Sequence, residues 1–262
     1  MRPNRLRDLH AEGKPSFGAW LSVPSSVSAE VIAHAGFDWA CVDMQHGLID
    51  YQAMVTMLQA ISTTGTVPIV RVPWNEPGII MKSLDAGAYG VIIPMVNTRA
   101  EAEAAAGACH YAPRGYRSYG PIRAAIYAGR DYFDHADDTM LCIAMIETAQ
   151  ALDNLDAILS TPGVDACYVG PADLSVSLGL PPRSDHEGGP FTEALERIVA
   201  ACRKHGVVPG AHAGSPQVAL KRIQQGFQFL EVTADADAMA RAAAADLKTV
   251  RGADGGPVST YA

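Results

Sequence analysis

The sequence predicts an α/β fold of the (β/α)8 TIM-barrel type. Eight short apolar runs alternate with longer stretches of helical periodicity along the 262 residues. The runs are continuously apolar, which is typical of parallel strands buried on both faces, and the length fits one barrel. A doubly wound open sheet fits the same alternation nearly as well, so the number of elements alone does not decide the topology.

The predicted strands and helices follow one another in order. Strands are expected at Phe17–Val23, Trp39–Asp43, Val67–Val72, Gly90–Pro94, Leu141–Glu147, Ala166–Gly170, Val207–Ala211 and Phe227–Val232. Helices are expected at Ser26–Ala35, Tyr51–Thr63, Pro77–Ala86, Thr98–Gly107, Ala149–Ser160, Phe191–His205, Ser215–Gln225 and Ala236–Val250. Glycines follow several of these helices, where a left-handed C-terminal residue is common.

Two segments interrupt the alternation. Cys109–Arg130 is rich in arginine, tyrosine and glycine, and Pro181–Pro190 is rich in proline, glycine and charge. Both are expected to be irregular, and long loops in compact domains are often functional. We expect residues 1–251 to form a single domain and residues 252–262 to form a flexible tail.

Composition narrows the class of protein. Apolar residues make up 48% and charged residues 18%, which is typical of globular chains. The net charge of −8 and the absence of any basic run give no support to nucleic-acid binding. No apolar stretch approaches the roughly 18 residues of a membrane span, and the polar start lacks the apolar core of a signal peptide. The five cysteines form no CxxC pair, so we interpret them as reduced thiols of a cytoplasmic protein.

Polar residues gather where the predicted strands end. In a barrel of this kind the active site forms at the carboxyl ends of the strands. Residues with useful chemistry follow five of the eight strands, namely Asp43 and His46, Arg71, Glu147, Asp173, and His212. The sequence therefore predicts an active site at one end of the barrel.

Glu147 and Asp173 form a candidate metal pair. Two carboxylates with open positions suit Mg²⁺ or Mn²⁺, which prefer oxygen ligands and retain water, and substrate oxygens could complete the coordination. The alternative is two ordinary acids at strand ends, with Asp173 capping a helix. Gly170-Pro171-Ala172-Asp173 also opens a short helix, whose free backbone N–H groups favour an anion such as a carboxylate. A tight turn that needs glycine and proline explains the same residues.

His46 and Arg71 are candidates for proton transfer and charge stabilisation. An imidazole titrates near neutral pH and can serve as a general base, and Asp43 or Asp85 could raise its basicity. Arg71 carries a fixed charge on a bidentate fork suited to an enolate or carboxylate oxygen. The alternatives are a hydrogen-bonded structural histidine and a surface ion pair.

The positions of the lysines argue against one type of aldolase chemistry. None of the five lysines lies at the carboxyl end of a predicted strand, where a Schiff-base enzyme needs one. This favours activation by a metal. Neither a GxxxxGK[ST] loop nor a GxGxxG fingerprint is present, so no organic cofactor is expected.

From about Phe17 to Val250 the sequence resembles the HpcH/HpaI aldolase family of class II pyruvate aldolases. The resemblance rests on six ordered motifs: VDMQHG at 42–47, IVRVPW at 69–74, LDAG at 84–87 followed by VIIPMV at 91–96, YAPRGYRS at 111–118, IET at 146–148 and VGPADLS at 169–175. It implies a phosphoenolpyruvate/pyruvate-type barrel and a carbon–carbon lyase. Such an enzyme joins a 2-oxo acid, such as pyruvate or hydroxypyruvate, to an aldehyde, or reverses that reaction.

The resemblance also implies roles for individual residues. His46 corresponds to the active-site base, Asp85 to the acid that raises its basicity, and Arg71 to the stabiliser of the enolate. Glu147 and Asp173 correspond to ligands of a divalent metal, here expected to be Mg²⁺, Mn²⁺ or Co²⁺. The resemblance also implies that the substrate carboxylate binds the backbone of Ala172 and Asp173, next to Gly170 and Pro171. A homo-oligomer is implied too, a hexamer built as a trimer of dimers, often with the C-terminal helix exchanged between subunits.

Met145 departs from the family pattern, which usually has a substrate-contacting glutamine two residues before the metal-binding glutamate. Because methionine cannot make the hydrogen bond of that glutamine, the preference among 2-oxo acid donors is expected to be affected.

The alternatives to an aldolase are a related metal-enolate enzyme, either a CoA-ester lyase or a 2-oxo diacid decarboxylase, an inactive barrel used for binding or assembly, and a cofactor-free phosphosugar isomerase. The Arg114–Arg123 segment could favour an aldehyde with a carboxylate, or could form subunit contacts.

Overall fold

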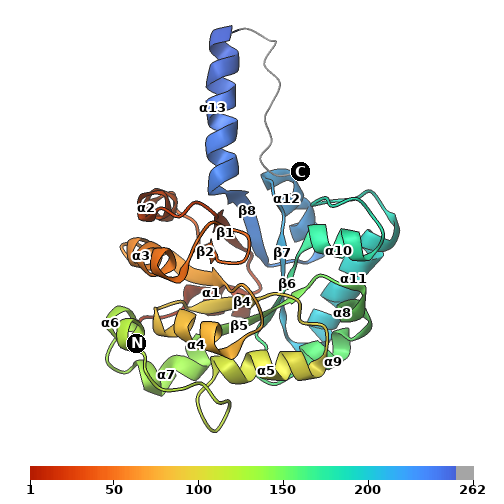
Figure 1. Ribbon diagram of the computed structural model, residues 1–262. Helices are drawn as coiled ribbons and strands as arrows, with labels where there is room; N and C mark the ends of the chain where they lie inside the picture. The colour runs from red at the N-terminus through yellow and green to blue at the C-terminus, as the bar shows by residue number, and fades with distance from the viewer. Residues whose placement is uncertain (252–262) are drawn as a thin grey trace.

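The computed structural model describes residues 1–251, and within them eight parallel strands close into a barrel in chain order (Figure 1). The last strand pairs with the first, which confirms the barrel and excludes the open sheet. The strands are β1 (Ser16–Leu21), β2 (Trp39–Asp43), β3 (Val67–Arg71), β4 (Gly90–Ile93), β5 (Leu141–Ile146), β6 (Ala166–Val169), β7 (Val208–His212) and β8 (Phe229–Ala234). The predicted tail at 252–262 lies outside the described residues.

The strand registers bring the predicted polar residues to one end of the barrel. Asp43 at the end of β2 pairs with Arg71 at the end of β3, and His212 at the end of β7 pairs with Glu231 of β8. The strand residues before these positions are almost all buried, as their continuous apolar pattern predicts. The chemistry therefore lies on the carboxyl ends and the packed core lies beneath it.

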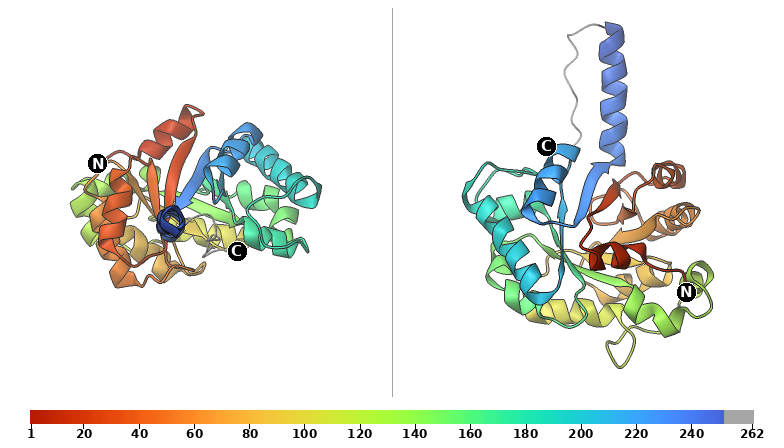
Figure 2. Two further views of the ribbon diagram at one scale, coloured as in Figure 1. Left: turned by 90° about the horizontal axis from the view of Figure 1, so that it is seen from above. Right: turned by 180° about the vertical axis from the view of Figure 1, so that it is seen from behind.

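The helices form a layer outside the strands (Figure 2). Most begin at a side-chain cap that satisfies free N–H groups, as Ser25, Asp50, Thr98, Thr148 and Ser215 do. The predicted helices correspond to α2 (Ser26–His34), α3 (Tyr51–Ile61), α4 (Pro77–Asp85), α5 (Arg99–Cys109), α8 (Ala149–Asp153), α9 (Leu155–Leu159), α11 (Gly189–His205), α12 (Pro216–Gln225) and α13 (Asp235–Arg251).

Several short helices differ from the predicted pattern. The supposedly irregular 109–130 segment contains α6 (Ile122–Ala128), and α7 (Tyr132–Thr139) follows it. Neither has a side-chain cap at its start, so the usual sequence signal is missing. The polar N-terminus forms α1 (Arg5–Ala11), and α10 (Pro171–Ser177) follows β6 as expected. The helix predicted at 149–160 divides into α8 and α9 at Asn154.

The C-terminal helix α13 stands away from the barrel (Figure 1). Of its residues only Asp235, at its start, is buried. The Asp235 carboxylate accepts hydrogen bonds from the backbone N–H groups of Ser22 at 2.9 Å and Val23 at 3.2 Å. These bonds fix the base of α13 to the end of β1, while the rest of the helix has no layer of its own chain to pack on.

Two predictions about the chain's environment can be compared with the structure. All five cysteines are buried and free, as expected for reduced thiols. Across residues 1–251 no helix combines the length and the apolar character that crossing a membrane requires.

Candidate active site

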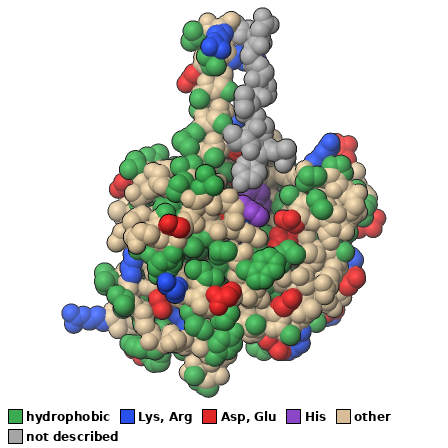
Figure 3. Space-filling view, viewed as in Figure 1, with side chains coloured by type: hydrophobic (Ala, Val, Ile, Leu, Met, Phe, Trp, Pro, Cys, Tyr) green, Lys and Arg blue, Asp and Glu red, His purple; other side chains and the backbone are tan. Residues whose placement is uncertain are grey.

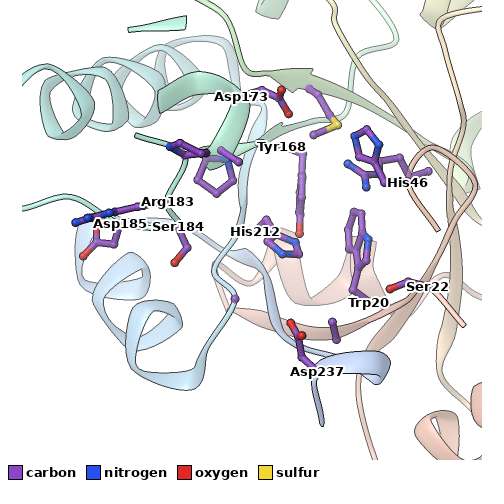
Figure 4. Close-up of a pocket in the computed structure, with 18 residues that line it drawn as sticks. Trp20, Ser22, His46, Tyr168, Asp173, Arg183, Ser184, Asp185, His212 and Asp237 are labelled. Carbon is purple, nitrogen blue, oxygen red and sulfur yellow. The ribbon is translucent and has the colours of Figure 1, made fainter. Parts of the chain in front are cut away.

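A cavity of about 480 Å³ opens at the carboxyl ends of the strands (Figure 4). Its wall includes His46, Arg71, Met145 and the segment 170–173, so most of the predicted site residues are brought together. The volume lies in the range of small-molecule sites. The second irregular segment also contributes to this wall through Pro182 to Asp185.

Asp43 and Arg71 form a buried ion pair beside the cavity. The Arg71 Nε and Nη2 atoms donate to the two Asp43 carboxylate oxygens at 2.8 and 2.6 Å. The Asp43 side chain is 1% exposed and that of Arg71 is 11% exposed, which excludes the alternative of a surface ion pair. The Trp20 indole N–H donates to the same carboxylate at 3.1 Å. The guanidinium is therefore held in one orientation at the cavity wall.

The pair also fixes the charge of both partners. Burial alone would raise the pKa of Asp43, but the hydrogen bonds and charge of Arg71 and the bond from Trp20 hold that pKa below its usual value. Burial would lower the pKa of Arg71, but Asp43 raises it. Asp43 also accepts from the backbone N–H groups of Gln45 and His46. It thereby shapes the turn that carries His46 into the cavity.

Glu147 is buried beneath the cavity at the end of β5. Its Oε1 atom accepts from the backbone N–H of Met95 at 2.8 Å. Met95 has a φ of 56°, the left-handed conformation that a non-glycine residue rarely adopts. The strained backbone at the end of β4 is thus used to hold the Glu147 carboxylate.

Glu147 is poised to change its protonation near neutral pH. Burial, as the largest cause, raises its pKa from 4.5 to about 7. The bond from Met95 opposes this change, and the nearby negative charge of Asp173 adds to it. A carboxylate that is costly to ionise next to a second carboxylate would gain from a bound cation.

The donor set around Glu147 fits a divalent cation that prefers oxygen. A side chain at Gly170 would meet the Glu147 Oε2 atom at 2.4 Å, so only glycine leaves this oxygen open at the cavity. Within residues 1–251 there is no group of three or more His, Cys, Asp or Glu residues arranged to hold a metal. A cation at Glu147 and Asp173 would therefore have only two side-chain ligands. Two carboxylates with open positions are what Mg²⁺ or Mn²⁺ accepts, because such ions keep water or substrate oxygens.

The start of α10 faces the same cavity. Its N-cap residue is Gly170, which provides no side-chain cap, and Pro171 is its first residue. The first-turn N–H groups of Ala172 and Asp173 therefore have no capping side chain, and both residues line the cavity.

Asp85 does not line the cavity within one chain. It is the last residue of α4, which runs back from the end of β3 to the amino end of the barrel. There it accepts a hydrogen bond from Arg117 Nη2 at 2.7 Å. The expected pairing of Asp85 with His46 is therefore not formed within a chain, because the two residues lie at opposite ends of the barrel. It stays a prediction that only a contact between copies could meet.

The arginine-rich segment 114–123 is also remote from the cavity. Arg114 pairs with Asp138, and Arg123 donates to the backbone oxygen of Ala86. Neither these arginines nor any lysine of the described chain lines the cavity. The suggestion that this segment recognises an acceptor carboxylate is not supported within one chain, whereas the lack of a cavity lysine agrees with the argument against a Schiff base.

Several cavity residues had no role in the sequence interpretation. Trp20 and Tyr168 belong to apolar strand runs, which the pattern interprets as core, and their rings stack at 5.7 Å. His212 ends β7, and that position marks it among the polar residues at the strand ends without giving it a role. Asp237 belongs to the first turn of α13, which the sequence does not connect with the barrel mouth.

Comparison with known families gives a direct match. The model of the HpcH/HpaI aldolase/citrate lyase family matches residues 16–242. This chain belongs to that family. The match includes all eight strands and every predicted site residue.

Individual relatives of the family cover nearly the whole chain. A protein of Rhizorhabdus wittichii described as a hydroxypyruvate/pyruvate aldolase is 41% identical over 92% of this chain and 96% of its own length. A 4-hydroxy-2-oxo-heptane-1,7-dioate aldolase of Salmonella arizonae is 36% identical over 92% of both chains. The structure of a family member from Burkholderia cenocepacia has a TM-score of 0.88 and 34% identity, covering 95% of this chain and 100% of that one. The structure of a citrate synthase has a TM-score of 0.84 and 29% identity, covering 94% and 97%.

The raised pKa of Glu147 predicts a pH-dependent stability in metal-free protein. Folding raises this pKa above its unfolded value. The contribution of Glu147 to stability is therefore fully present below pH 4.5 and is lost as the pH rises through about 7. We expect the free energy of unfolding to fall by about 3 kcal/mol across that window. Urea unfolding in the presence of EDTA measures it. Glu147→Gln should remove most of the dependence, and an equal pH slope in both proteins would contradict the prediction.

Proposed function

We propose that this protein is a class II aldolase that joins pyruvate, or a related 2-oxo acid such as hydroxypyruvate, to an aldehyde and catalyses the reverse cleavage. The observation that carries the proposal is the cavity lined by Asp173 and the anchored Arg71 guanidinium, with the buried Glu147 carboxylate beneath it and close enough to Asp173 for the two charges to interact. Membership of the aldolase family and the names of its relatives support the same reaction.

A divalent cation held by Glu147 and Asp173 would supply Lewis-acid polarisation of the donor carbonyl. The N–H groups at the start of α10 bind the donor carboxylate and orient the 2-oxo acid. No organic cofactor is needed, because the chemistry requires only charge stabilisation and proton transfer.

Arg71 and His46 divide the remaining work. Asp43 holds Nε and Nη2 of Arg71, so Nη1 is directed to the oxygen that gains charge when the donor forms its enolate. His46 is exposed in the cavity wall and takes the proton from carbon 3 of the donor. The enolate carbon then attacks the aldehyde, and the new alkoxide takes up a proton.

The rival reactions have less support. A CoA-ester lyase needs a basic site for the CoA phosphates, and the only arginines in the cavity wall of the described chain are Arg71, held by Asp43, and Arg183 at the rim. The two relatives described above are both named for aldol chemistry. A 2-oxo diacid decarboxylase would use the same carboxylates, but it would release CO₂ from a 2-oxo diacid and would not join pyruvate to an aldehyde in the test below.

The test is exchange of the pyruvate methyl protons with D₂O, followed by aldol addition to an aldehyde. We expect EDTA to abolish both, and Mg²⁺, Mn²⁺ or Co²⁺ to restore both. Borohydride added with pyruvate should leave every lysine unmodified by mass spectrometry. Full activity in rigorously metal-free protein, or a stable pyruvyl-lysine adduct, would overturn the proposal. As a control on the base, His46→Ala should bind pyruvate but exchange its protons about 10²–10⁴-fold more slowly.

Met145 predicts a change in donor preference. The side chain lines the cavity at the end of β5, two residues before Glu147, and presents an apolar surface. Met145→Gln adds a hydrogen-bonding group worth about 0.5–1.5 kcal/mol. The ratio of kcat/KM for pyruvate and hydroxypyruvate should therefore change about threefold to tenfold at constant metal affinity. Steady-state kinetics with one fixed aldehyde measures it, and an unchanged ratio would show that residue 145 does not face the donor.

We also propose that the active protein is a homo-oligomer, a hexamer arranged as a trimer of dimers with α13 exchanged between subunits. Apolar side chains are exposed on the surface (Figure 3), among them Val31 of α2 at 65%, Leu48 after β2 at 84% and Trp74 after β3 at 57%. The apolar residues Met239 and Leu247 of the projecting α13 are about half exposed as well. Such surfaces are expected to be covered by a partner.

Sedimentation of the full chain tests this assembly. The double variant Val31→Glu, Leu48→Glu should dissociate, because it places charges in the proposed contact. The same change at Leu220, an exposed residue of α12 outside this patch, should leave the mass unchanged. A wild-type protein that sediments as a monomer at micromolar concentration would refute the proposal.

The buried free thiols fit a reducing compartment, and we propose that the protein is located in the cytoplasm.

A further inference from the structure

His212 lies on the side of the cavity away from Asp173 (Figure 4). It ends β7, and its ring packs edge-on against Trp20 with centroids 5.1 Å apart. The side chain is 32% exposed, so one part of the imidazole is packed and another part faces the cavity. None of the roles proposed above uses this histidine.

A fully buried carboxylate lies behind the imidazole. Glu231 of β8 is 0% exposed, and its Oε2 atom accepts from the backbone N–H groups of Ala213 at 3.1 Å and Gly214 at 2.7 Å. The same oxygen is 3.5 Å from Nδ1 of His212, close enough for charge pairing although longer than a good hydrogen bond. The other oxygen, Oε1, has no hydrogen-bond partner within residues 1–251.

This arrangement fixes which nitrogen of His212 meets a ligand. A buried carboxylate is costly without compensation, so it favours a proton on the nitrogen that faces it. With Nδ1 directed to Glu231, Nε2 is the atom available on the cavity side. Nε2 accepts a hydrogen bond when the imidazole is neutral and donates one when it is charged. A hydroxyl group can pair with either form.

We propose that His212, held by the buried Glu231, forms the acceptor subsite and selects aldehydes that carry a hydroxyl group on the carbon next to the carbonyl. The donor occupies the Asp173 side and the acceptor the His212 side of one cavity. His212 binds the acceptor hydroxyl, and Glu231 is a positioning residue that acts through it. The inference rests on the proposed aldolase function and names the acceptor class for it.

The test compares two aldehydes that differ by a single hydroxyl, glycolaldehyde and acetaldehyde, with pyruvate as the donor. The wild-type protein should prefer glycolaldehyde in kcat/KM. His212→Phe keeps an aromatic ring but removes the hydrogen bond, so this preference should fall about threefold to tenfold. Glu231→Gln should lower it in the same direction, and His212→Gln, which restores a polar group, should recover part of it.

Deuterium exchange into pyruvate is measured on every variant and keeps the outcomes distinct. Absence of exchange in the wild type would sink the aldolase proposal itself. Normal exchange with an unchanged aldehyde ratio, or an equal loss for both aldehydes, would overturn the acceptor subsite. Loss of exchange in His212→Phe would also overturn it, because His212 would then act on the donor.

A matched control completes the design. His205 forms another histidine–carboxylate contact, 2.6 Å from Asp156 and away from the cavity wall, so His205→Gln should leave the aldehyde ratio unchanged. A change there as large as in His212→Phe would overturn the assignment.

Discussion

The ion pair of Asp43 and Arg71 is the interaction on which the rest of the site depends. It joins the ends of two neighbouring strands, receives the indole N–H of Trp20 and fixes the turn that carries His46. Because both partners are buried, removal of either one would leave an uncompensated charge under the cavity. Trp20, the turn at His46 and the Arg71 guanidinium are all held in position by this pair. Its main contribution is therefore to orient these groups.

The sequence was sufficient for the barrel and for placing the residues of the proposed donor side at one end of it. Continuous apolar runs mark buried parallel strands, and polar residues directly after them mark the active end, which is how His46, Arg71, Glu147 and Asp173 could be found. On the proposed acceptor side only His212 has such a position at a strand end, and the residues around it carry no signal of this kind. Trp20 resembles core in the pattern, and Glu231 lies inside an apolar strand. Asp85 stays a prediction, because a motif gives no information on which end of a helix faces the cavity, and within one chain this residue lies at the amino end of the barrel.

Two buried carboxylates in this barrel illustrate how the surroundings of one chemical group determine its use. Glu147 faces a second acid and one strained backbone N–H, and its pKa is raised to about 7. Glu231 has two backbone N–H donors and a histidine beside it. The first arrangement favours a cation, whereas the second orients an imidazole. A relative named for aldol chemistry on a seven-carbon dioate and a solved structure named a citrate synthase both resemble this chain, so the fold alone does not determine the reaction.

The attachment of α13 couples two surfaces that evolution would otherwise adjust separately. Its first turn places Asp237 in the cavity wall, and Asp235 fastens that turn to the end of β1. The rest of the helix extends to where a neighbouring subunit would receive it. In the proposed oligomer, a substitution that improves packing between subunits would also tilt a helix whose base borders the cavity. A change in quaternary structure would then alter aldehyde specificity without any substitution in the cavity wall.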